Sequence, residues 1–513
     1  MNTLLHTLQQ HAHAHPDSRA LVGTHATISY RQLMDAIESC RCWLIKQGCR
    51  TIALLMDNDP AWAVIDLAAQ TAHCTLVPLP AFFSDKQLIH AMQDAGVDTI
   101  ITDQPQRIVQ LGSTHRWIGN QPESLTVTGN EYRYFSLEAN GQAADSTQQS
   151  MKITYTSGTT GEPKGVCLDD AALYRVAHAV MARTAIEANH RHVSLLPLAT
   201  LLENSAGLYS TLLAGATAVL LPMQLTGMQG ASGLNIKKMA NVLRTECANS
   251  AILLPQMLQE LVQALESKAI AALPELKFLA VGGAPLSSQL LHRARQCGLP
   301  LYEGYGLSEC ASVVAVNCAN DHRPGSVGKP LEHVELRFAS DGEILIKGSL
   351  FQGYLGAAAH DHSHYFASGD IGYLDDDGYL YITGRKKNMF ITSYGRNIAP
   401  EWVEKELIIH PAIAQAAVFG EGQTECCAVI VAADKLSTDM VTIATQQVQQ
   451  AITQTNLTLP DYAKIAQWIF ADRPFSMSNE QLTATGRPRR NAIWSRYGER
   501  LNARYQQLST ASN

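Results

Sequence analysis

The sequence predicts an α/β protein: a large N-terminal domain of helix-covered, mostly parallel sheets, followed by a small α+β domain. Its 513 residues exceed what one hydrophobic core usually accommodates. The first hundred residues alternate strand and helix patterns, which is typical of parallel sheets covered by helices. Late in the chain the pattern changes twice. The predicted domains are therefore 1–386, with a β subdomain of short strands and tight turns at about 330–386, and 387–513.

Local signals place the first elements. Ser29 and Ser84 are each followed three residues later by glutamine, a capping-box signature that predicts a helix start. Pro60 suits the first position of a third helix. Residues 104–150 are polar and are predicted to form an irregular segment on the surface. Short apolar runs predict buried strands at 51–56, 75–79 and 99–103.

The same alternation continues from residue 151 to about 330. HVSLLPL (192–198) predicts a strand, and an apolar helix is expected around 204–215. LKFLAVGGAPLS (276–287) predicts a strand, a glycine turn and the start of a helix.

Composition excludes several classes of function. The net charge of −7 argues against partners held by a basic surface, such as nucleic acid. No apolar run approaches the 18 residues of a transmembrane helix, and the N-terminus does not resemble a signal peptide. The 11 cysteines are scattered without metal-ligand spacing, so we expect reduced thiols and a cytoplasmic protein.

The stretch ITYTSGTTGEPKGVCLD (153–169) predicts a phosphate-binding loop. Glycines and small hydroxyl residues offer many backbone and side-chain donors, and one lysine adds positive charge. Its G-x-x-G-x-x-K spacing differs from that of the nucleoside-triphosphatase P-loop. The expected phosphate-binding residues are Thr156, Ser157, Gly158, Thr159, Thr160, Gly161 and Lys164.

This loop resembles the phosphate loop of the adenylate-forming superfamily, which includes acyl-CoA synthetases, aryl-CoA ligases, luciferases and peptide-synthetase adenylation domains. Four further motifs are similar to those of the superfamily and occur in its order. The residues of these motifs are most similar to those of long-chain fatty acyl-CoA ligases. The four motifs are VGGAPLS (281–287), EGYGLSECASVV (303–314), GSVGKP (325–330) and SGDIGYLDDDGYLYITGRKKN (368–388).

The resemblance implies roles for individual residues. Tyr305 would lie on or beside the adenine, Ser308 would contact phosphate, and Glu309 would bind Mg²⁺. Asp370 would accept hydrogen bonds from the ribose hydroxyls, and Arg385 would reach ribose or phosphate. The same motifs add Gly283, Ala284, Pro285, Glu303, Gly304 and Gly306 to the nucleotide site.

The resemblance also implies a two-step reaction with ATP, Mg²⁺ and a thiol. A carboxylate attacks the α-phosphorus of ATP, with Thr156 and Glu309 among the catalytic residues. The mobile C-terminal domain then turns about a hinge, matched here by Lys387. A thiol, from CoA or from the phosphopantetheine of a separate acyl carrier protein, takes the acyl group. Gly395 lies in the segment that would line the tunnel for that thiol.

One position departs from the superfamily pattern. Where relatives carry a catalytic lysine near the C-terminus, LTATGRPRRNAI (482–493) has Arg487. Arginine keeps the charge but presents a broad planar fork. In one interpretation Arg487 still bridges the carboxylate and the α-phosphate. In the other, adenylation is lost, and the protein only binds nucleotide or performs the thiol half-reaction.

The segment LPLATLLEN (196–204) bears on the acid substrate. Thr200 stands where many fatty acyl-CoA synthetases have histidine, and Glu203 comes too late to match the acidic residue that holds an amino-acid ammonium. We therefore expect an uncharged acyl tail, favouring a medium- or long-chain fatty acid, with an aryl acid as the alternative. The expected substrate-binding residues are Thr200, Glu203, Gly282 and Gly395.

Overall fold

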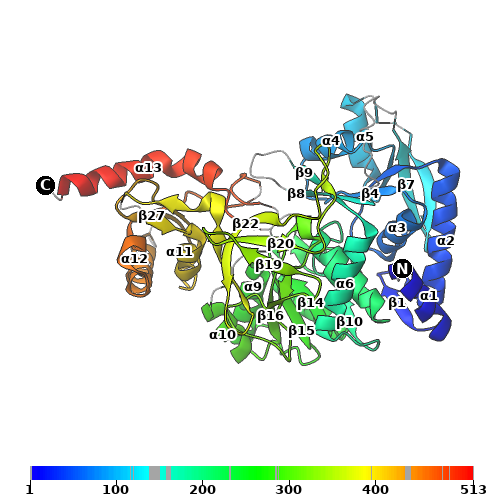
Figure 1. Ribbon diagram of the computed structural model, residues 1–513, viewed down its shortest axis with the longest axis horizontal. Helices are drawn as coiled ribbons and strands as arrows, with labels where there is room; N and C mark the ends of the chain where they lie inside the picture. Colours follow the sequence, from blue (N-terminus) through cyan, green and yellow to red (C-terminus); the bar gives the residue numbers. More distant parts are fainter. Residues whose placement is uncertain are drawn as a thin grey trace.

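The computed structural model describes residues 3–511 with internal gaps. The gaps are 116, 119–120, 138–150, 157–162, 230–232, 284–285, 287, 394–395, 434–440, 477 and 484–485. Two large sheets occupy one end of the molecule and the C-terminal elements the other (Figure 1).

The first large sheet has eight strands, and its centre is parallel, as predicted. Strand β3 pairs in parallel with β4 and β5, and β4 pairs in parallel with β8. In spatial order the strands are β21 (Gly353–Tyr354), β9 (Lys164–Leu168), β8 (Lys152–Thr156), β4 (Thr75–Pro78), β3 (Thr51–Leu55), β5 (Thr99–Thr102), β7 (Asn130–Ser136) and β6 (Glu123–Val127).

In the second large sheet the six strands from β16 to β1 in spatial order are parallel to one another, β2, β17 and β18 are antiparallel to their neighbours, and the sheet has nine strands in all. In spatial order they are β18 (Lys329–Pro330), β17 (Ala315–Val316), β16 (Leu301–Tyr305), β15 (Phe278–Val281), β14 (Ser250–Leu253), β10 (Arg191–Val193), β11 (Thr217–Val219), β1 (Arg19–Val22) and β2 (Thr27–Ser29).

Helices cover these sheets, and the local signals mark their starts correctly. Ser29 and Ser84 both form complete capping boxes, and Pro60 is the first residue of its helix. The helices are α1 (Leu4–Ala14), α2 (Tyr30–Gln47), α3 (Pro60–Thr71), α4 (Asp85–Asp94), α5 (Pro105–Thr114), α6 (Asp170–Thr184), the π-helix η1 (Glu203–Tyr209), α7 (Ser210–Leu213), α8 (Ile236–Thr245), α9 (Pro255–Glu266), α10 (Ser288–Gln296) and the short turn η2 (Ser308–Cys310).

The prediction of an irregular surface segment at 104–150 is wrong. Within it the chain forms α5, β6 and β7, and β7 pairs with β5. Strand β7 buries Tyr132 and Tyr134, whereas Glu131 before them is exposed and Arg133 between them is only partly buried. Antiparallel strands with one solvated face have a polar average composition, which explains why the sequence resembled a loop. The predicted strand at 192–198 is also shorter, since only Arg191–Val193 is extended into the sheet.

Between the two ends lies a four-stranded antiparallel sheet, matching the short-strand pattern after residue 330. Its strands are β19 (Glu335–Phe338), β20 (Glu343–Lys347), β22 (Phe366–Leu374) and β23 (Leu380–Arg385). A separate two-stranded ribbon is formed by β12 (Met228–Gln229) and β13 (Gly233–Leu234).

The chain after β23 forms its own packed unit, with two clusters of buried side chains drawn only from residues beyond 389. These elements lie at the far end of the long axis, next to β22 (Figure 1). They are η3 (Lys386–Asn388), β24 (Phe390–Ile391), β25 (Asn397–Ile398), α11 (Pro400–Leu407), β26 (Ile413–Phe419), β27 (Cys426–Ala432), α12 (Val441–Thr458), η5 (Asp461–Ala463), β28 (Ile465–Phe470) and α13 (Arg490–Ala511). Among the described residues, no helix is long and apolar enough to cross a bilayer.

Candidate functional site

A cavity of about 2750 Å³ lies where the large sheets, the four-stranded sheet and the C-terminal elements meet. Most of the predicted site residues that the structure describes line it. They are Thr156, Lys164, Thr200, Gly282, Gly283, Glu303, Gly304, Tyr305, Gly306, Ser308, Glu309, Asp370, Arg385, Lys387 and Arg487. Ser157, Gly158, Thr159, Thr160, Gly161, Ala284, Pro285 and Gly395 were also predicted, and they lie outside the described residues.

A buried carboxylate is held by two neighbours on one side of this cavity. Asp370 and Arg385 are paired across β22 and β23, and the Arg385 Nε lies 2.6 Å from Asp370 Oδ1. The Tyr305 hydroxyl, at the end of β16, donates to Asp370 Oδ2 at 2.7 Å. Burial raises the pKa of Asp370, while Arg385 and Tyr305 oppose the rise. The two contacts fix the orientation of a carboxylate that can accept further hydrogen bonds.

Arg487 stands on a tight turn that carries it into the cavity. The Thr483 N–H donates to the Arg487 carbonyl at 2.8 Å, and the Arg487 N–H donates to Thr483 Oγ1 at 3.0 Å. Gly486 has the left-handed φ of +77° that the turn needs. The Arg487 Nε donates to the Gly283 carbonyl at 2.6 Å. Its terminal nitrogens bond to none of the described residues.

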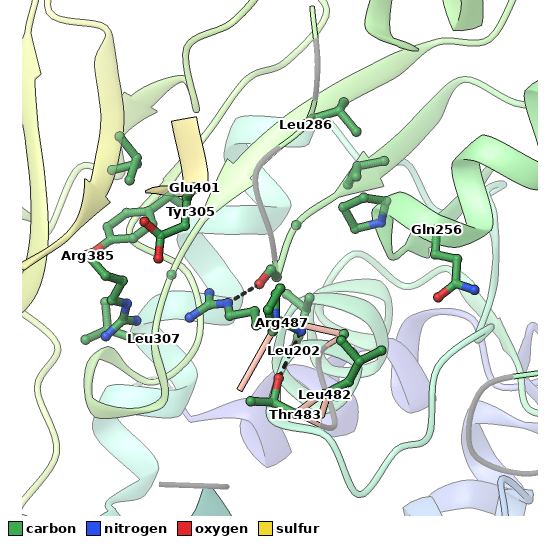
Figure 2. A pocket seen from close by; sticks show the side chains of 18 of the residues that line it. Leu202, Gln256, Leu286, Tyr305, Leu307, Arg385, Glu401, Leu482, Thr483 and Arg487 are labelled. Atoms are coloured by element: carbon green, nitrogen blue, oxygen red, sulfur yellow. Dashed lines mark hydrogen bonds between the residues drawn. The ribbon is translucent and has the colours of Figure 1, made fainter. Parts of the chain in front are cut away.

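Figure 2 shows the Arg487 side chain extending toward the side of the cavity where Tyr305, Arg385 and Glu401 lie, with Gln256 on the opposite side. Burial lowers the pKa of Arg487, and the charge of Arg385 lowers it further.

Lys387 adds a third positive charge to this region. Burial lowers its pKa, followed by the charges of Arg385 and Arg487. Asp370 and Glu401 are the carboxylates that act in the opposite direction on both Arg487 and Lys387. Three cations close enough to destabilise one another in a partly buried cavity favour the binding of an anion.

Glu309, the predicted metal ligand, is held by a residue that the sequence motifs did not identify. The Tyr354 hydroxyl donates to Glu309 Oε1 at 2.7 Å, and the Lys164 Nζ lies 5.5 Å from the centre of the Tyr354 ring. Strand β21 places Tyr354 there by pairing it with Val166 of β9, directly after the predicted phosphate loop. Tyr354 therefore connects the end of that loop to Glu309.

The residues around Glu309 fit Mg²⁺ bound together with phosphates. Mg²⁺ is usually held by one or two carboxylates plus substrate phosphates and water. Glu309 Oε2 makes no hydrogen bond to the described residues, and it belongs to a side chain that lines the cavity. Among those residues, no cluster of three His, Cys, Asp or Glu side chains could hold a metal alone. One carboxylate oxygen beside the predicted phosphate loop matches this pattern.

Glu303 is a second buried carboxylic acid in the cavity wall. Its Oε2 accepts a hydrogen bond from the Gly325 N–H at 3.1 Å. Burial raises the pKa of Glu303 to about 7, and the charge of Lys405 is the largest opposing influence. Near neutral pH a large fraction of this group therefore carries a proton and can donate as well as accept.

The two predicted substrate contacts on segment 196–204 differ. Thr200 lines the cavity, and its hydroxyl donates to the Pro197 carbonyl at 2.6 Å. Glu203 is fully buried outside the cavity wall. Its carboxylate contacts His192 Nε2 at 2.8 Å and accepts from the Leu196 N–H at 3.3 Å. Glu203 therefore fastens the start of η1 to β10, and this geometry gives its predicted contact with substrate no support.

Comparison with known families identifies the chain. The family described as AMP-binding enzyme matches residues 8–355, and the AMP-binding enzyme C-terminal domain matches residues 387–509. The chain belongs to the AMP-binding enzyme family. This confirms the resemblance to adenylate-forming enzymes and the enzyme class that it implied, an AMP-forming acid–thiol ligase.

Relatives of this AMP-binding enzyme include ligases for different acids. A long-chain-fatty-acid–CoA ligase, FadD15, of Mycobacterium bovis is 28% identical, covering 97% of this chain and 96% of the relative. A 2-succinylbenzoate–CoA ligase of Bacillus cereus is 27% identical, covering 82% and 86%. The o-succinylbenzoate CoA synthetase of Bacillus subtilis, solved with its acyl-adenylate intermediate, has a TM-score of 0.72 at 23% identity and covers 95% and 97%. This structural likeness confirms the predicted fold class.

Proposed function

We propose that this AMP-binding enzyme joins a carboxylic acid to ATP, giving an acyl-adenylate and pyrophosphate, and then transfers the acyl group to the thiol of CoA. One observation carries the proposal. The Arg487 Nε is anchored on the Gly283 carbonyl, which leaves both terminal nitrogens for ligands in a cavity that also contains Arg385 and Lys387.

The first step must bring two anions together, the carboxylate and the triphosphate. Catalysis of such a step depends mostly on positioning and on charge neutralisation. Arg487, Arg385 and Lys387 supply positive charge at one end of the site, and Lys164 supplies it beside Glu309. Mg²⁺ bound at Glu309 would neutralise charge on the phosphates as pyrophosphate forms.

The arginine at position 487 suits this role. A lysine ammonium has a single nitrogen. A guanidinium has three, so its Nε–H can donate to a protein carbonyl while two parallel N–H groups of the terminal nitrogens donate to an oxyanion. The contact with Gly283 uses only Nε. The geometry therefore supports an active adenylating site over a protein that only binds nucleotide.

For the second step we propose that residues 387–513 move as a domain about Lys387. In this structure Gly384, just before the proposed hinge, packs tightly against Ala399 just after it. A Cβ at Gly384 would lie 2.5 Å from the Ala399 Cβ. Strand β23 and helix α11 pack together across the proposed boundary, and turning would separate them so that a thiol could approach. We further propose a cytoplasmic location, supported by eleven cysteines that form no disulfide within the described residues.

We propose a medium- or long-chain fatty acid as the substrate. The likeness to FadD15 spans nearly the whole chain, and the cavity wall includes the apolar Leu202, Ala206, Ile252 and Val313. The second candidate is an aryl acid, because 2-succinylbenzoate–CoA ligases are nearly as similar in identity, although over less of the chain.

Pyrophosphate release from ATP–Mg²⁺ tests both candidates. The enzyme would be offered straight-chain acids of two to eighteen carbons and a set of aryl acids. Arg487→Ala would be compared with Arg496→Ala, an arginine variant of α13 outside the cavity wall. We expect release within one window of chain length, lost in Arg487→Ala and kept in Arg496→Ala. ATP binding without release for any acid would overturn the proposal. Adding CoA or a phosphopantetheinylated carrier protein then identifies the acceptor.

A further inference from the structure

Helix α4 contacts the chain on both sides of the predicted phosphate loop. Of the residues expected to bind phosphate in that loop, the structure describes Thr156, the last residue of β8, and Lys164, the first residue of β9. These two residues pair across the antiparallel strands, and both line the cavity. Any group that fixes the two strand ends therefore also fixes the positions of these predicted phosphate contacts.

His90 of α4 holds the chain directly before Lys164. Its Nε2 lies 3.0 Å from the carbonyl oxygen of Pro163. A carbonyl oxygen only accepts hydrogen bonds, so Nε2 carries a proton and donates. The His90 ring also meets the Tyr155 ring edge to face, with 6.2 Å between the ring centres. His90 thus contacts both Tyr155 of β8 and Pro163 before β9.

Asp94, one turn further along α4, holds strand β8. The Tyr155 hydroxyl donates to Asp94 Oδ2 at 2.7 Å. Burial, followed by this hydrogen bond, raises the pKa of Tyr155, so the hydroxyl keeps its proton and remains a donor. The Tyr155 ring also packs against β9, since a Cβ at Gly165 would lie 3.3 Å from Tyr155 Cζ. Residues four apart lie on one face of a helix, so one face of α4 carries both His90 and Asp94.

Helix α4 is itself well anchored. A capping box fixes its first turn, and Leu88, Ala91 and Met92 are buried in the same cluster of apolar side chains as Tyr155. His90 and Asp94 do not belong to that cluster. Their contacts with the predicted phosphate loop can therefore be removed without disturbing the core that holds the helix.

We propose that His90 and Asp94 are positioning residues for the β- and γ-phosphates of ATP. From outside the cavity wall they fix the strand ends that carry Thr156 and Lys164. This inference rests on the proposed ligase function, in which pyrophosphate leaves beside Lys164 and the AMP part of ATP lies toward Arg487. Loss of the α4 contacts should weaken the binding of ATP and spare a nucleotide that lacks the two outer phosphates.

Calorimetric titrations of the whole chain with ATP–Mg²⁺ and with AMP test this inference. We expect His90→Ala to bind ATP–Mg²⁺ about tenfold more weakly than the wild type, the loss of one ordinary hydrogen bond. The same variant should bind AMP as the wild type does. His90→Gln, whose side-chain amide can donate to the Pro163 carbonyl, should regain most of the affinity for ATP.

Asp94→Ala tests the second contact, and because Asp94 is exposed this variant should stay folded. It should also weaken the binding of ATP–Mg²⁺ and spare that of AMP. Adding Tyr155→Phe to it should cause little further loss, because both changes remove the same hydrogen bond. The matched control is His292→Ala, since His292 contacts Gln296 one turn further along α10 and lies outside the cavity wall. The control should leave both affinities unchanged.

Steady-state kinetics should show the same separation. In His90→Ala the KM for ATP should rise about tenfold while the KM for the acid stays at the wild-type value. Equal ATP affinity in the wild type, His90→Ala and Asp94→Ala would overturn the inference. An equal loss of ATP and AMP binding would also overturn it, because general damage to the fold has that effect. ATP binding without pyrophosphate release for any acid would overturn the ligase function, and the calorimetric comparison of ATP with AMP would still decide the role of His90.

Discussion

The Arg487 Nε lies 2.6 Å from the carbonyl oxygen of Gly283, a residue 204 positions earlier in the chain. Gly283 belongs to the segment that matches the AMP-binding enzyme family, and Arg487 to the segment that matches its C-terminal domain. This one hydrogen bond therefore joins the two matched segments inside the cavity. Any movement that withdraws the turn at 483–487 must break it.

Replacing Arg487 by lysine tests whether the anchor matters as well as the charge. Lysine keeps the charge but cannot hold Gly283 and present a parallel pair of donors at once. We expect Arg487→Lys to slow the acid-dependent exchange of pyrophosphate into ATP by about 10- to 100-fold, the loss of a charge-assisted hydrogen bond. Equal or faster exchange in the lysine variant would show that the contact with Gly283 has no role in adenylation.

Replacing Tyr354 by phenylalanine tests the support of Glu309. The variant keeps the ring that Lys164 faces and removes the hydroxyl that fixes the Glu309 carboxylate. Groups that orient a metal ligand typically contribute about 10- to 100-fold to metal affinity. We expect the Mg²⁺ concentration for half-maximal ATP binding, measured by calorimetry, to rise by roughly tenfold.

The control for Tyr354→Phe is Tyr365→Phe, which removes a tyrosine–glutamate hydrogen bond to Glu335 at the exposed surface. It should leave the Mg²⁺ dependence unchanged. If Tyr354→Phe lowers the Tm while the Mg²⁺ dependence stays at the wild-type value, Tyr354 has only a structural role.

The sequence predicted those parts of the fold and of the candidate site that depend on residues close together in the chain. The capping boxes at Ser29 and Ser84 and the glycine turn at Gly283 depend on short-range patterns. Tyr354 was not identified, because its contact with Glu309 forms only when the distant strands β21 and β9 pair. No local pattern distinguishes such a tyrosine from a core residue.

The buried lysine Lys152 is a second feature that local sequence patterns did not predict. A lysine at the start of a strand is usually exposed, yet this one is fully buried, with its Nζ 2.8 Å from Asp66 Oδ1. Removing one partner of a buried ion pair typically costs about 3–5 kcal/mol. We expect Lys152→Met to lower the free energy of unfolding by roughly that amount in urea titrations. The double variant Lys152→Met with Asp66→Leu should recover much of the loss. A single variant as stable as the wild type would contradict the assigned ion pair.

Glu303 predicts a dependence of stability on pH with a definite sign. Its pKa in the folded protein is about 7, above the ordinary 4.5, so the folded state binds this proton more tightly than the unfolded state. The stabilisation is therefore complete below about pH 4.5 and is lost as the pH rises through about 7. Glu303→Gln cannot lose a proton, so its free energy of unfolding lacks this loss. Between pH 5 and 8 the free energy of unfolding of the wild type should therefore fall relative to that of Glu303→Gln by on the order of 2 kcal/mol. Urea titrations at several pH values measure the difference, and Glu332→Gln, at an exposed position, is the control. Parallel curves for wild type and Glu303→Gln would mean that Glu303 ionises normally in the folded enzyme, despite its burial.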